Sequence, residues 1–462
     1  MAYRPTIGLE IHAELKTRTK MFCDCANDPD EMSPNINVCP ICMAHPGTLP
    51  VINREAVKHV LRVGSAIGGT IADYNEFDRK SYFYPDIPKG YQISQYAHPL
   101  IVGGKLAGVD ITRIHLEEDT ARSIHASGKS LVDFNRSGVP LMELVTEPVI
   151  RDAETAGKFA RELQLLLRTL GAGEANLEKG EMRVEANISV SDEEGNLGTK
   201  VEVKNLNSFR SVERAIAYEI DRQIALIAKG ERVVQETRGW NEAKQETFHQ
   251  RFKEGSADYR YFPEPDLPKL FLSEIPEFSR EVLGASLHEL PWERRARYLQ
   301  IGLKTDDVEF LIATIERGIF FDAVIKWFDE KSESVILAAN YFISDVAGEP
   351  GNATPESFVK LIQMFIAQKL SSRGVKDVLA EMCSSGGEPE MIAEQLNLIQ
   401  IHDSGALGEV VDAVIAKEEK AVEEYKNGKQ AALQYLIGKA MKESKGAGNP
   451  EILKTIIKEK IG

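Results

Sequence analysis

The sequence lacks the features that mark membrane, secreted or repetitive proteins. No segment of its 462 residues reaches about 18 consecutive apolar residues, so no membrane span is expected. The N-terminal residues 1–10 contain no apolar signal core. We find no internal repeat and no long low-complexity tract. We therefore expect a globular protein of the cytosol.

Two motifs of nucleotide and amide chemistry are also missing. No Gly-x-x-x-x-Gly-Lys-Ser/Thr loop is present, because the glycine-rich run at 64–69 lacks the lysine. No convincing nucleophile-and-base arrangement for amide hydrolysis is found. If ATP binds to this chain, we expect it to bind on a sheet rather than on a phosphate loop.

Excess basic charge is absent as well. The formal net charge is −15, which argues against sequence-blind binding of nucleic acid but does not exclude a local basic surface. The length allows two or three domains. Gly, Pro and Asn turns with mixed strand and helix patterns predict an α+β domain over 1–291, and helical patterns predict all-α domains at 292–404 and 405–462.

Two helices of the first domain are clear from their apolar period. Residues 153–170 and 211–229 each place apolar side chains on one stripe, and each is followed by a glycine suited to a C-cap. The stripes are Phe159, Leu163, Leu166, Leu167 and Leu170 in the first, and Val212, Ile216, Ile220, Ile224 and Ile227 in the second. We interpret both helices as packing elements.

Three predicted strands carry polar residues along one face. Residues 6–15, 182–190 and 200–205 alternate apolar and polar side chains, and successive strand side chains point to opposite sides. The last two strands are separated by a turn-like segment, which predicts an antiparallel hairpin. The polar sets are Glu10, His12 and Glu14; Arg183, Glu185 and Asn187; and Lys200, Glu202 and Lys204.

Further carboxylates lie in apolar surroundings. Glu143 stands within an apolar run, where a lone carboxylate must be paired or bound to a cation. Three adjacent acids at 117–119 end another strand. Carboxylates hold Mg²⁺, and Lys and Arg neutralise phosphoryl oxygens, so these strands predict a site for metal and phosphate. The alternative is an ordinary solvated polar face.

Four of the five cysteines lie close together. Cys23 and Cys25 are followed after thirteen residues by Cys39 and Cys42. Four thiolates at these spacings can close tetrahedrally around Zn²⁺, and such a closed site is structural. We predict a zinc site that clamps the loop at 16–45. A zinc ribbon that binds nucleic acid would use the same ligands.

Long polar strings in this sequence resemble one family, the B subunits of the bacterial aspartyl/glutamyl-tRNA amidotransferase. The strings cover most of the first predicted domain. They lie at 7–16, 77–86, 88–95, 133–143, 182–187, 203–208 and 258–266.

The resemblance implies a glutamine-synthetase-like cradle built on a largely antiparallel sheet, followed by a helical domain and a tRNA-binding tail. It implies that ATP phosphorylates the side-chain carboxylate of misacylated Glu-tRNA(Gln) or Asp-tRNA(Asn), and that ammonia then displaces phosphate. The ammonia would come from glutamine through an amidase A subunit, with a small C subunit completing a heterotrimer. ATP and Mg²⁺ would be the cofactors, and zinc a scaffold present in part of the family.

The resemblance also implies roles for individual residues. It places Mg²⁺ on His12, Glu118 and Glu143, with Glu10 beside them. Lys80 and Lys89 would contact phosphate and line the ammonia path, and Glu185 would accept a proton from ammonium. The supporting residues would be Arg183, Asn187, Lys204 and Asn205.

The C-terminal tail reverses the acidic character of the chain. From residue 425 onward, eight lysines stand against three acids, which predicts a phosphate-contacting surface. The resemblance supports tRNA contacts for Lys439, Lys442 and Lys445; a solvated helical face is the alternative.

Three other functions share parts of this pattern. An archaeal E-subunit relative has a large extra domain after the cradle, for which this chain has no room. A ligase for a free amino acid would need no basic tail. A zinc-dependent RNA-binding protein would bind tRNA without turning over ATP, and it would leave Glu143 unexplained.

Overall fold

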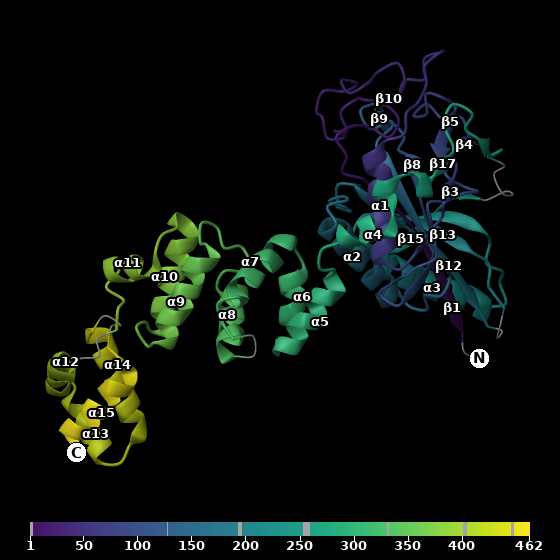
Figure 1. Ribbon diagram of the computed structural model, residues 1–462. Coiled ribbons are helices and arrows are strands. Elements are labelled where there is room, and N and C mark those ends of the chain that lie inside the picture. The colour runs from purple at the N-terminus through teal and green to yellow at the C-terminus, as the bar shows by residue number, and fades with distance from the viewer. Residues whose placement is uncertain are drawn as a thin grey trace. The chain divides into compact units, whose positions relative to one another are not determined.

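The computed structural model describes residues 3–126, 128–192, 196–252, 259–329, 332–400, 404–444 and 448–462, without the side chains of 251, 252, 404 and 406. The chain divides into two compact units, Met1–Pro291 and Trp292–Gly462. The first contains the strands, and the second is helical (Figure 1). Within the described residues, no helix combines the length and the apolar character needed to cross a membrane.

The first unit is built on one large sheet. Within the described residues 13 strands join it, in the main order β15-β14-β13-β12-β1-β11-β8-β5-β4-β16. The strands are β1 (Arg4–Glu14), β2 (Thr70–Ile71), β3 (Tyr74–Asn75), β4 (Asp78–Ser81), β5 (Tyr91–Ser94), β6 (Ile101–Val102), β7 (Lys105–Leu106), β8 (Val109–Glu118), β9 (Arg122–Ala126), β10 (Lys129–Asp133), β11 (Pro140–Thr146), β12 (Met182–Ser191), β13 (Val201–Leu206), β14 (Glu236–Asn241), β15 (Glu246–Phe252), β16 (Phe262–Pro263) and β17 (Leu270–Phe271).

Strand pairing confirms the predicted class. Among the described strands every pair is antiparallel except β13 with β14. The predicted hairpin of β12 and β13 is present. The unit also contains α1 (Arg54–Ala66), α2 (Ala153–Thr169), α3 (Phe209–Ala228), α4 (Arg280–Ala285) and short 3₁₀ turns at Leu272–Glu274 and Pro276–Phe278. The unit is therefore α+β with a largely antiparallel sheet.

The two faces of β1 differ as its alternation predicts. Ile7, Leu9, Ile11 and Ala13 are at most 1% exposed. Helix α1 packs on β8, and α3 packs on β12 and β13, which gives the sheet a helical cover (Figure 1). The polar residues of β1 occupy the opposite side and are only half-buried. Apolar burial thus fixes which face of the sheet carries the polar residues.

The predicted helices are present as α2 and α3, but one stripe differs. The five apolar residues predicted for α2 are all buried. In α3, Val212 and Ile216 are buried as expected, whereas Glu219 and Gln223 are completely buried in place of the later isoleucines. Arg222 forms two hydrogen bonds with the Glu219 carboxylate, at 2.7 and 2.8 Å. Such pairing is what permits a buried charge, and apolar periodicity cannot reveal it.

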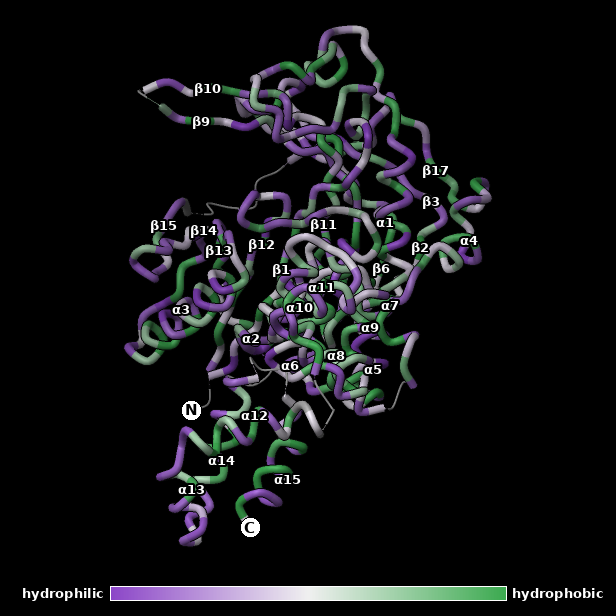
Figure 2. The backbone as a smooth tube through the Cα atoms, turned by 90° about the vertical axis from the view of Figure 1, so that its left-hand side faces the viewer, coloured by the Kyte–Doolittle hydropathy of each residue, from purple (hydrophilic) through white to green (hydrophobic). Residues whose placement is uncertain are grey.

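From Pro291 onward, the described chain forms helices joined by short connections. They are α5 (Pro291–Ile301), α6 (Thr305–Ile312), α7 (Ile315–Ile325), α8 (Glu333–Ser344), α9 (Pro355–Ile366), α10 (Ser372–Ser385), α11 (Pro389–Gln395), α12 (Ser404–Lys417), α13 (Glu419–Lys426), α14 (Gln430–Glu443) and α15 (Pro450–Ile461). Leu407, Leu436 and Leu453 belong to one buried cluster, and hydrophobic segments of α12, α14 and α15 appear in green in Figure 2. The last four helices therefore share a core of their own.

Candidate functional site

Three neighbouring strands bring acids and histidines together on the polar face of the sheet. Strand β1 lies between β11 and β12, and β8 lies on the far side of β11. His12 is opposite Glu143, and Glu143 is opposite His115 on β8. Glu117 follows on the same face of β8, because strand side chains alternate. We call Glu10, His12, His115, Glu117 and Glu143 the acid–histidine cluster.

Glu143 is the centre of this cluster. It is 6% exposed, and its Oε2 atom lies 3.5 Å from His12 Nε2 and 3.2 Å from His115 Nε2. Burial alone would raise the pKa of Glu143, but the two histidines outweigh burial and hold it well below its usual value. The otherwise costly buried carboxylate is thus kept ionised by positive charge beside it.

His12 responds to the same neighbours in the opposite sense. Its Nε2 atom lies 3.4 Å from Glu117 Oε1 and 4.0 Å from Glu10 Oε1. Burial lowers the pKa of His12, but the hydrogen bond to Glu143 and the surrounding carboxylates overcome that effect and raise it to about 9. The positive charge of the His12 imidazole therefore offsets the negative charge of the surrounding carboxylates. A bound divalent cation would offset the same negative charge.

The spacing of the cluster suits a small divalent cation. Ligand atoms from Glu10, His12 and Glu143 lie within 4.8 Å of one another, as do those from His115, Glu117 and Glu143. A cation with oxygen ligands at about 2.1 Å places neighbouring ligand atoms about 3 Å apart. The observed contacts of 3.2 to 3.5 Å are close to that spacing. The donor set therefore fits Mg²⁺, for which oxygen ligands are preferred.

Glu118 does not join the cluster, contrary to the expectation from the resemblance. Its Oε1 atom accepts a hydrogen bond from the Ile93 amide at 2.9 Å, and Lys89 Nζ lies 2.7 Å from its Oε2 atom. The reason is strand alternation, since Glu118 follows Glu117 and points to the other face. His115 is therefore a cluster member that the sequence analysis did not name, and Glu117 is one that it named only among three adjacent acids. Strand alternation puts 115, 117 and 119 on one face of β8, but the register of β8 against β11 was needed to show that this face is the one that carries Glu143.

Two lysines lie next to the cluster. Burial lowers the pKa of Lys80, but the nearby carboxylates of Glu117 and Glu143, among other groups, outweigh it and raise the pKa above its usual value. Lys204 Nζ lies 2.6 Å from Glu185 Oε2 and 3.8 Å from Glu202 Oε1. Lys80, Glu185 and Lys204, all expected to be site residues, thus lie near Glu10 and Glu143 on one face of the sheet.

The other expected supporting residues divide into two groups. Arg183 reaches Asp119 at 3.1 Å. Asn187 faces Gly8 across the sheet, and among the described residues no donor reaches its buried Oδ1 atom. Asn205 instead is exposed, with a positive φ of 64°, where the β12–β13 pairing shifts register. Arg183 and Asn187 therefore belong to the polar face, whereas Asn205 marks a bulge at its margin.

A cavity opens beside these groups. Its volume is about 650 Å³, within the range of small-molecule sites. Lys80 and Lys204 line it together with three tyrosines, Tyr82, Tyr84 and Tyr259. The arrangement offers positive charge for phosphoryl oxygens next to carboxylates for a cation, which is the chemistry of a nucleotide–metal site.

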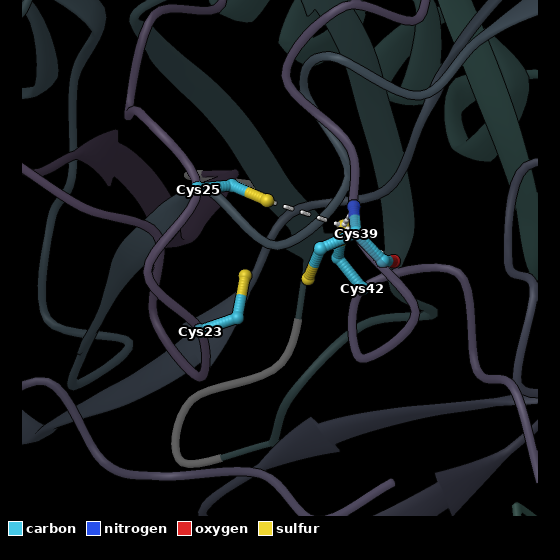
Figure 3. Close-up of side chains that lie close together, drawn as sticks. All are labelled: Cys23, Cys25, Cys39 and Cys42. Carbon is cyan, nitrogen blue, oxygen red and sulfur yellow. Dashed lines mark hydrogen bonds between the residues drawn. The ribbon is translucent and has the colours of Figure 1, made fainter.

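The four clustered cysteines lie together in the loop between β1 and α1, as Figure 3 shows. Their sulfur atoms lie within 4.8 Å of one another, and tetrahedral zinc needs sulfurs about 3.8 Å apart. A hydrogen bond with Cys23 lowers the pKa of Cys42, which favours the thiolate form that binds metal. The four cysteines therefore fit a metal such as zinc.

The tail lysines lie on and after α14. Lys439 Nζ pairs with Glu418 at 2.7 Å, and Lys442 is exposed near the end of the helix. Lys445 lies outside the described residues. One of the three expected contacts is therefore engaged within the protein, and one is open to solvent.

Comparisons with known proteins agree with this organisation. The family profile of the GatB/GatE catalytic domain matches residues 5–275, and that of the GatB domain matches 310–461. A relative from Thermus thermophilus, named as the B subunit of an aspartyl/glutamyl-tRNA(Asn/Gln) amidotransferase, is 42% identical over 100% of this chain and 99% of its own length. Relatives of the same name from Synechocystis and Thermoanaerobacter pseudethanolicus are each 41% identical, over 98% and 100% of this chain and 97% and 100% of their own lengths. The chain belongs to the family of B subunits of the tRNA-dependent aspartyl/glutamyl amidotransferases.

Proposed function

We propose that this chain uses ATP and Mg²⁺ to phosphorylate the side-chain carboxylate of Glu-tRNA(Gln), Asp-tRNA(Asn) or both, and then amidates it with ammonia. The observation that carries the proposal is the acid–histidine cluster with Lys80 and Lys204 beside it on one sheet face. In the first step a carboxylate oxygen attacks the γ-phosphorus and ADP leaves. In the second step ammonia attacks the carbonyl carbon and inorganic phosphate leaves.

We propose Glu143, Glu117, Glu10 and His12 as the residues that hold Mg²⁺, with Glu117 in the place expected for Glu118. The ion would neutralise phosphoryl charge and orient the transferred group. Lys80 and Lys204 face the cavity of about 650 Å³, where they would bind phosphoryl oxygens. Arg183 and Asn187 would support the polar face, and Asn205, exposed at the bulge, would lie at its margin. This division gives ionised carboxylates to the cation and ammonium groups to the nucleotide.

We propose that Glu185 receives the proton that the attacking nitrogen must lose. Its carboxylate lies 2.6 Å from Lys204 Nζ and close to Glu10. A positioned carboxylate contributes as a general base by taking a proton from the nucleophile. We therefore propose that Glu185 acts in the amidation step and not in phosphorylation.

Changing Glu185 to Gln should separate the two steps. We expect phosphate release from ATP in the presence of Glu-tRNA(Gln) to stay within about twofold of wild type, while Gln-tRNA formation falls about a hundredfold. Labelled phosphate and aminoacyl-tRNA are measured in the same reactions. Glu178→Gln, at an exposed acid before the same strand, is the control. Equal loss of both products would place Glu185 in phosphorylation instead.

The ammonia would come from an amidase A subunit, with a small C subunit in the complex. Lys89 and Glu118 form a close ion pair at a cavity of about 260 Å³ that the cysteine loop also lines. This cavity lies on the side of the strand that Glu118 faces, away from the acid–histidine cluster. We propose that it is part of the route by which ammonia reaches the cluster.

Changing Lys89 to Met should impair ammonia delivery more than chemistry. The change leaves Glu118 buried without its cation, which favours rearrangement around the cavity. We expect glutamine-dependent amidation in the complex to fall about tenfold, whereas added ammonium salt restores the rate, because dissolved ammonia does not need the internal route. Lys105→Met, at an exposed ion pair, is the control. An equal fall with ammonium salt would show that Lys89 acts in the reaction itself.

We further propose that residues 405–462 form a tail domain that binds tRNA, with a helical domain at 292–404 before it. The support is the separate core shared by the last helices and the excess of lysine from residue 425 onward. Lys439, Lys442 and Lys445 would contact phosphates. The zinc would be structural, in a protein of the reducing cytosol, where thiols stay available for metal.

Reconstitution tests the proposed function as a whole. The chain is purified with its A and C partners and supplied with Glu-tRNA(Gln) or Asp-tRNA(Asn), ATP, Mg²⁺ and glutamine. We expect Gln-tRNA or Asn-tRNA, and phosphate release that depends on the charged tRNA. A complex that binds tRNA but forms neither product with either substrate would make the chain a binding protein.

A further inference from the structure

Five tyrosines form an unbroken row of ring contacts next to the acid–histidine cluster. Neighbouring ring centroids are 4.3 to 6.2 Å apart, at contact distance for aromatic pairs. The last pair is stacked, with 13° between the ring planes. In order, the row is Tyr84, Tyr82, Tyr259, Tyr261 and Tyr96.

The backbone fixes this tyrosine row, although its members come from separate segments. Strand β16 pairs with β4, and the Ser81 amide donates a hydrogen bond to the Tyr259 carbonyl at 2.9 Å. The Tyr96 amide donates to the Asp78 carboxylate at 2.9 Å. The five rings therefore lie in loops that directly flank β4, β5 and β16, and these backbone contacts tie the loops to the edge of the large sheet.

The two ends of the tyrosine row are exposed to solvent. Tyr84 and Tyr96, at its two ends, are 62% and 56% exposed, and the three rings between them are half-buried. Among the described residues, none of the five hydroxyl groups has a hydrogen-bond partner. A row that served packing alone would bury its rings and satisfy its hydroxyls.

The row runs beside the proposed reaction site. Lys80 Nζ lies 5.1 Å from the centroid of the Tyr259 ring. The same lysine interacts electrostatically with the carboxylates of Glu117 and Glu143. Three rings of the row line the cavity that Lys80 and Lys204 share. The middle of the row therefore lies next to the acid–histidine cluster, and a strand bound on the rings at one end of the row would reach the cluster with its terminus.

The charges around the row restrict the kind of molecule that can bind there. Carboxylates repel a phosphodiester chain, so ion pairs alone would not draw one to this face. Aromatic rings bind unpaired nucleotides by base stacking, and nearby lysine adds attraction for the backbone. One adenine base covers one or two rings, whereas the exposed rings at the two ends of the row, Tyr84 and Tyr96, offer separate stacking surfaces for more than one base.

We propose that the tyrosine row binds the unpaired 3′-terminal nucleotides of the tRNA and so guides the esterified amino acid to the acid–histidine cluster. This inference rests on the proposed function, because it concerns the substrate of that site. The stacking is tolerant of base identity, which suits an enzyme whose substrates differ elsewhere in the tRNA.

Trimming the tRNA tests the row directly. The full chain in complex with its partners is titrated with uncharged tRNA(Gln), intact or lacking its unpaired 3′ nucleotides. We expect wild type to bind the intact form at least about tenfold more tightly than the trimmed form. The double variant Tyr84→Ala/Tyr96→Ala should bind both forms equally. Both rings are exposed, and a thermal melt checks that the variant is folded.

Two controls separate stacking from other effects. The Tyr84→Phe/Tyr96→Phe pair keeps both rings and should keep the preference for intact tRNA. Phe271→Ala removes a 42%-exposed ring that packs on Tyr74, outside the row, and should also keep it. Loss of the preference in Phe271→Ala would overturn the proposal.

Other results would also overturn it. One is an equal effect of trimming on wild type and on the alanine pair. Another is an increase in the KM for ATP with unchanged tRNA binding, which would make the adenine of ATP the occupant. The proposed function is judged separately, by whether the wild-type complex forms amidated tRNA.

Discussion

Changing Glu143 to Gln is expected to lower ATP-dependent activation of the charged tRNA by about a thousandfold, while the Kd for tRNA changes less than about twofold. Removal of one group that stabilises charge in a reacting site commonly costs 10²- to 10³-fold, and Glu143 contacts both histidines at the centre of the cluster. A neutral amide removes the negative charge that would hold a cation. Labelled phosphate release and tRNA titration measure the two quantities.

The control for this prediction lies just beyond the same strand. Glu147 accepts a hydrogen bond from Thr112 at 2.7 Å, outside the acid–histidine cluster, and Glu147→Gln should keep normal activity. Thermal melts of both variants check folding, since Glu143→Gln leaves His12 and His115 without their shared negative charge. Activity within tenfold of wild type in a folded Glu143→Gln variant would remove Glu143 from the proposed metal site.

Changing Cys39 to Ser is expected to abolish zinc binding and lower the Tm by about 6–12 °C. Between Glu14 and Arg54 the described chain forms no helix or strand, only turns and isolated bridges, so a zinc ion would add four bonds that tie residues 23–25 to residues 39–42. A structural zinc contributes directly to folding. A loss of roughly 3 kcal/mol corresponds to this fall in Tm for a domain of this size. Elemental analysis gives the metal content, and calorimetry gives the Tm.

The fifth cysteine supplies the matched control. Cys383 lies in α10, outside the cysteine cluster, and Cys383→Ser should leave one zinc per chain. A strong chelator should reproduce the effect of Cys39→Ser on wild type and add nothing to that variant. Wild-type protein purified without zinc and with an unchanged Tm after zinc addition would show that the cysteines stabilise the loop without metal.

The acid–histidine cluster shows how far strand patterns can predict a site. The polar faces of β1, β12 and β13 follow from alternation, because burying one face leaves the other side chains together. Glu143 was recognisable since a carboxylate within an apolar run must be paired. Glu117 and Glu118 were not distinguished, because three adjacent acids look alike until the register of β8 against β11 assigns each one a face.

The tyrosine row shows what strand patterns do not reveal. Tyr82 and Tyr84 are far along the chain from Tyr259 and Tyr261, and no local pattern connects the two segments. The pairing of β16 with β4 creates their contacts. The buried Glu219 of α3 depends in part on a similar long-range contact, because Arg238 of β14 lies 3.6 Å from it in addition to the local partner Arg222.

The sequence by itself determined the fold class, the polar strand faces, the metal-like cysteine spacing and, through its motifs, the family. These features depend on residues close together in the sequence, because side-chain periodicity and ligand spacing can be read from the sequence directly. The tertiary structure decided that Glu117 rather than Glu118 faces Glu143, that Lys89 pairs with Glu118, and that five tyrosines meet. Each of these depends on strand register between distant segments, where a shift of one residue moves a side chain to the opposite face.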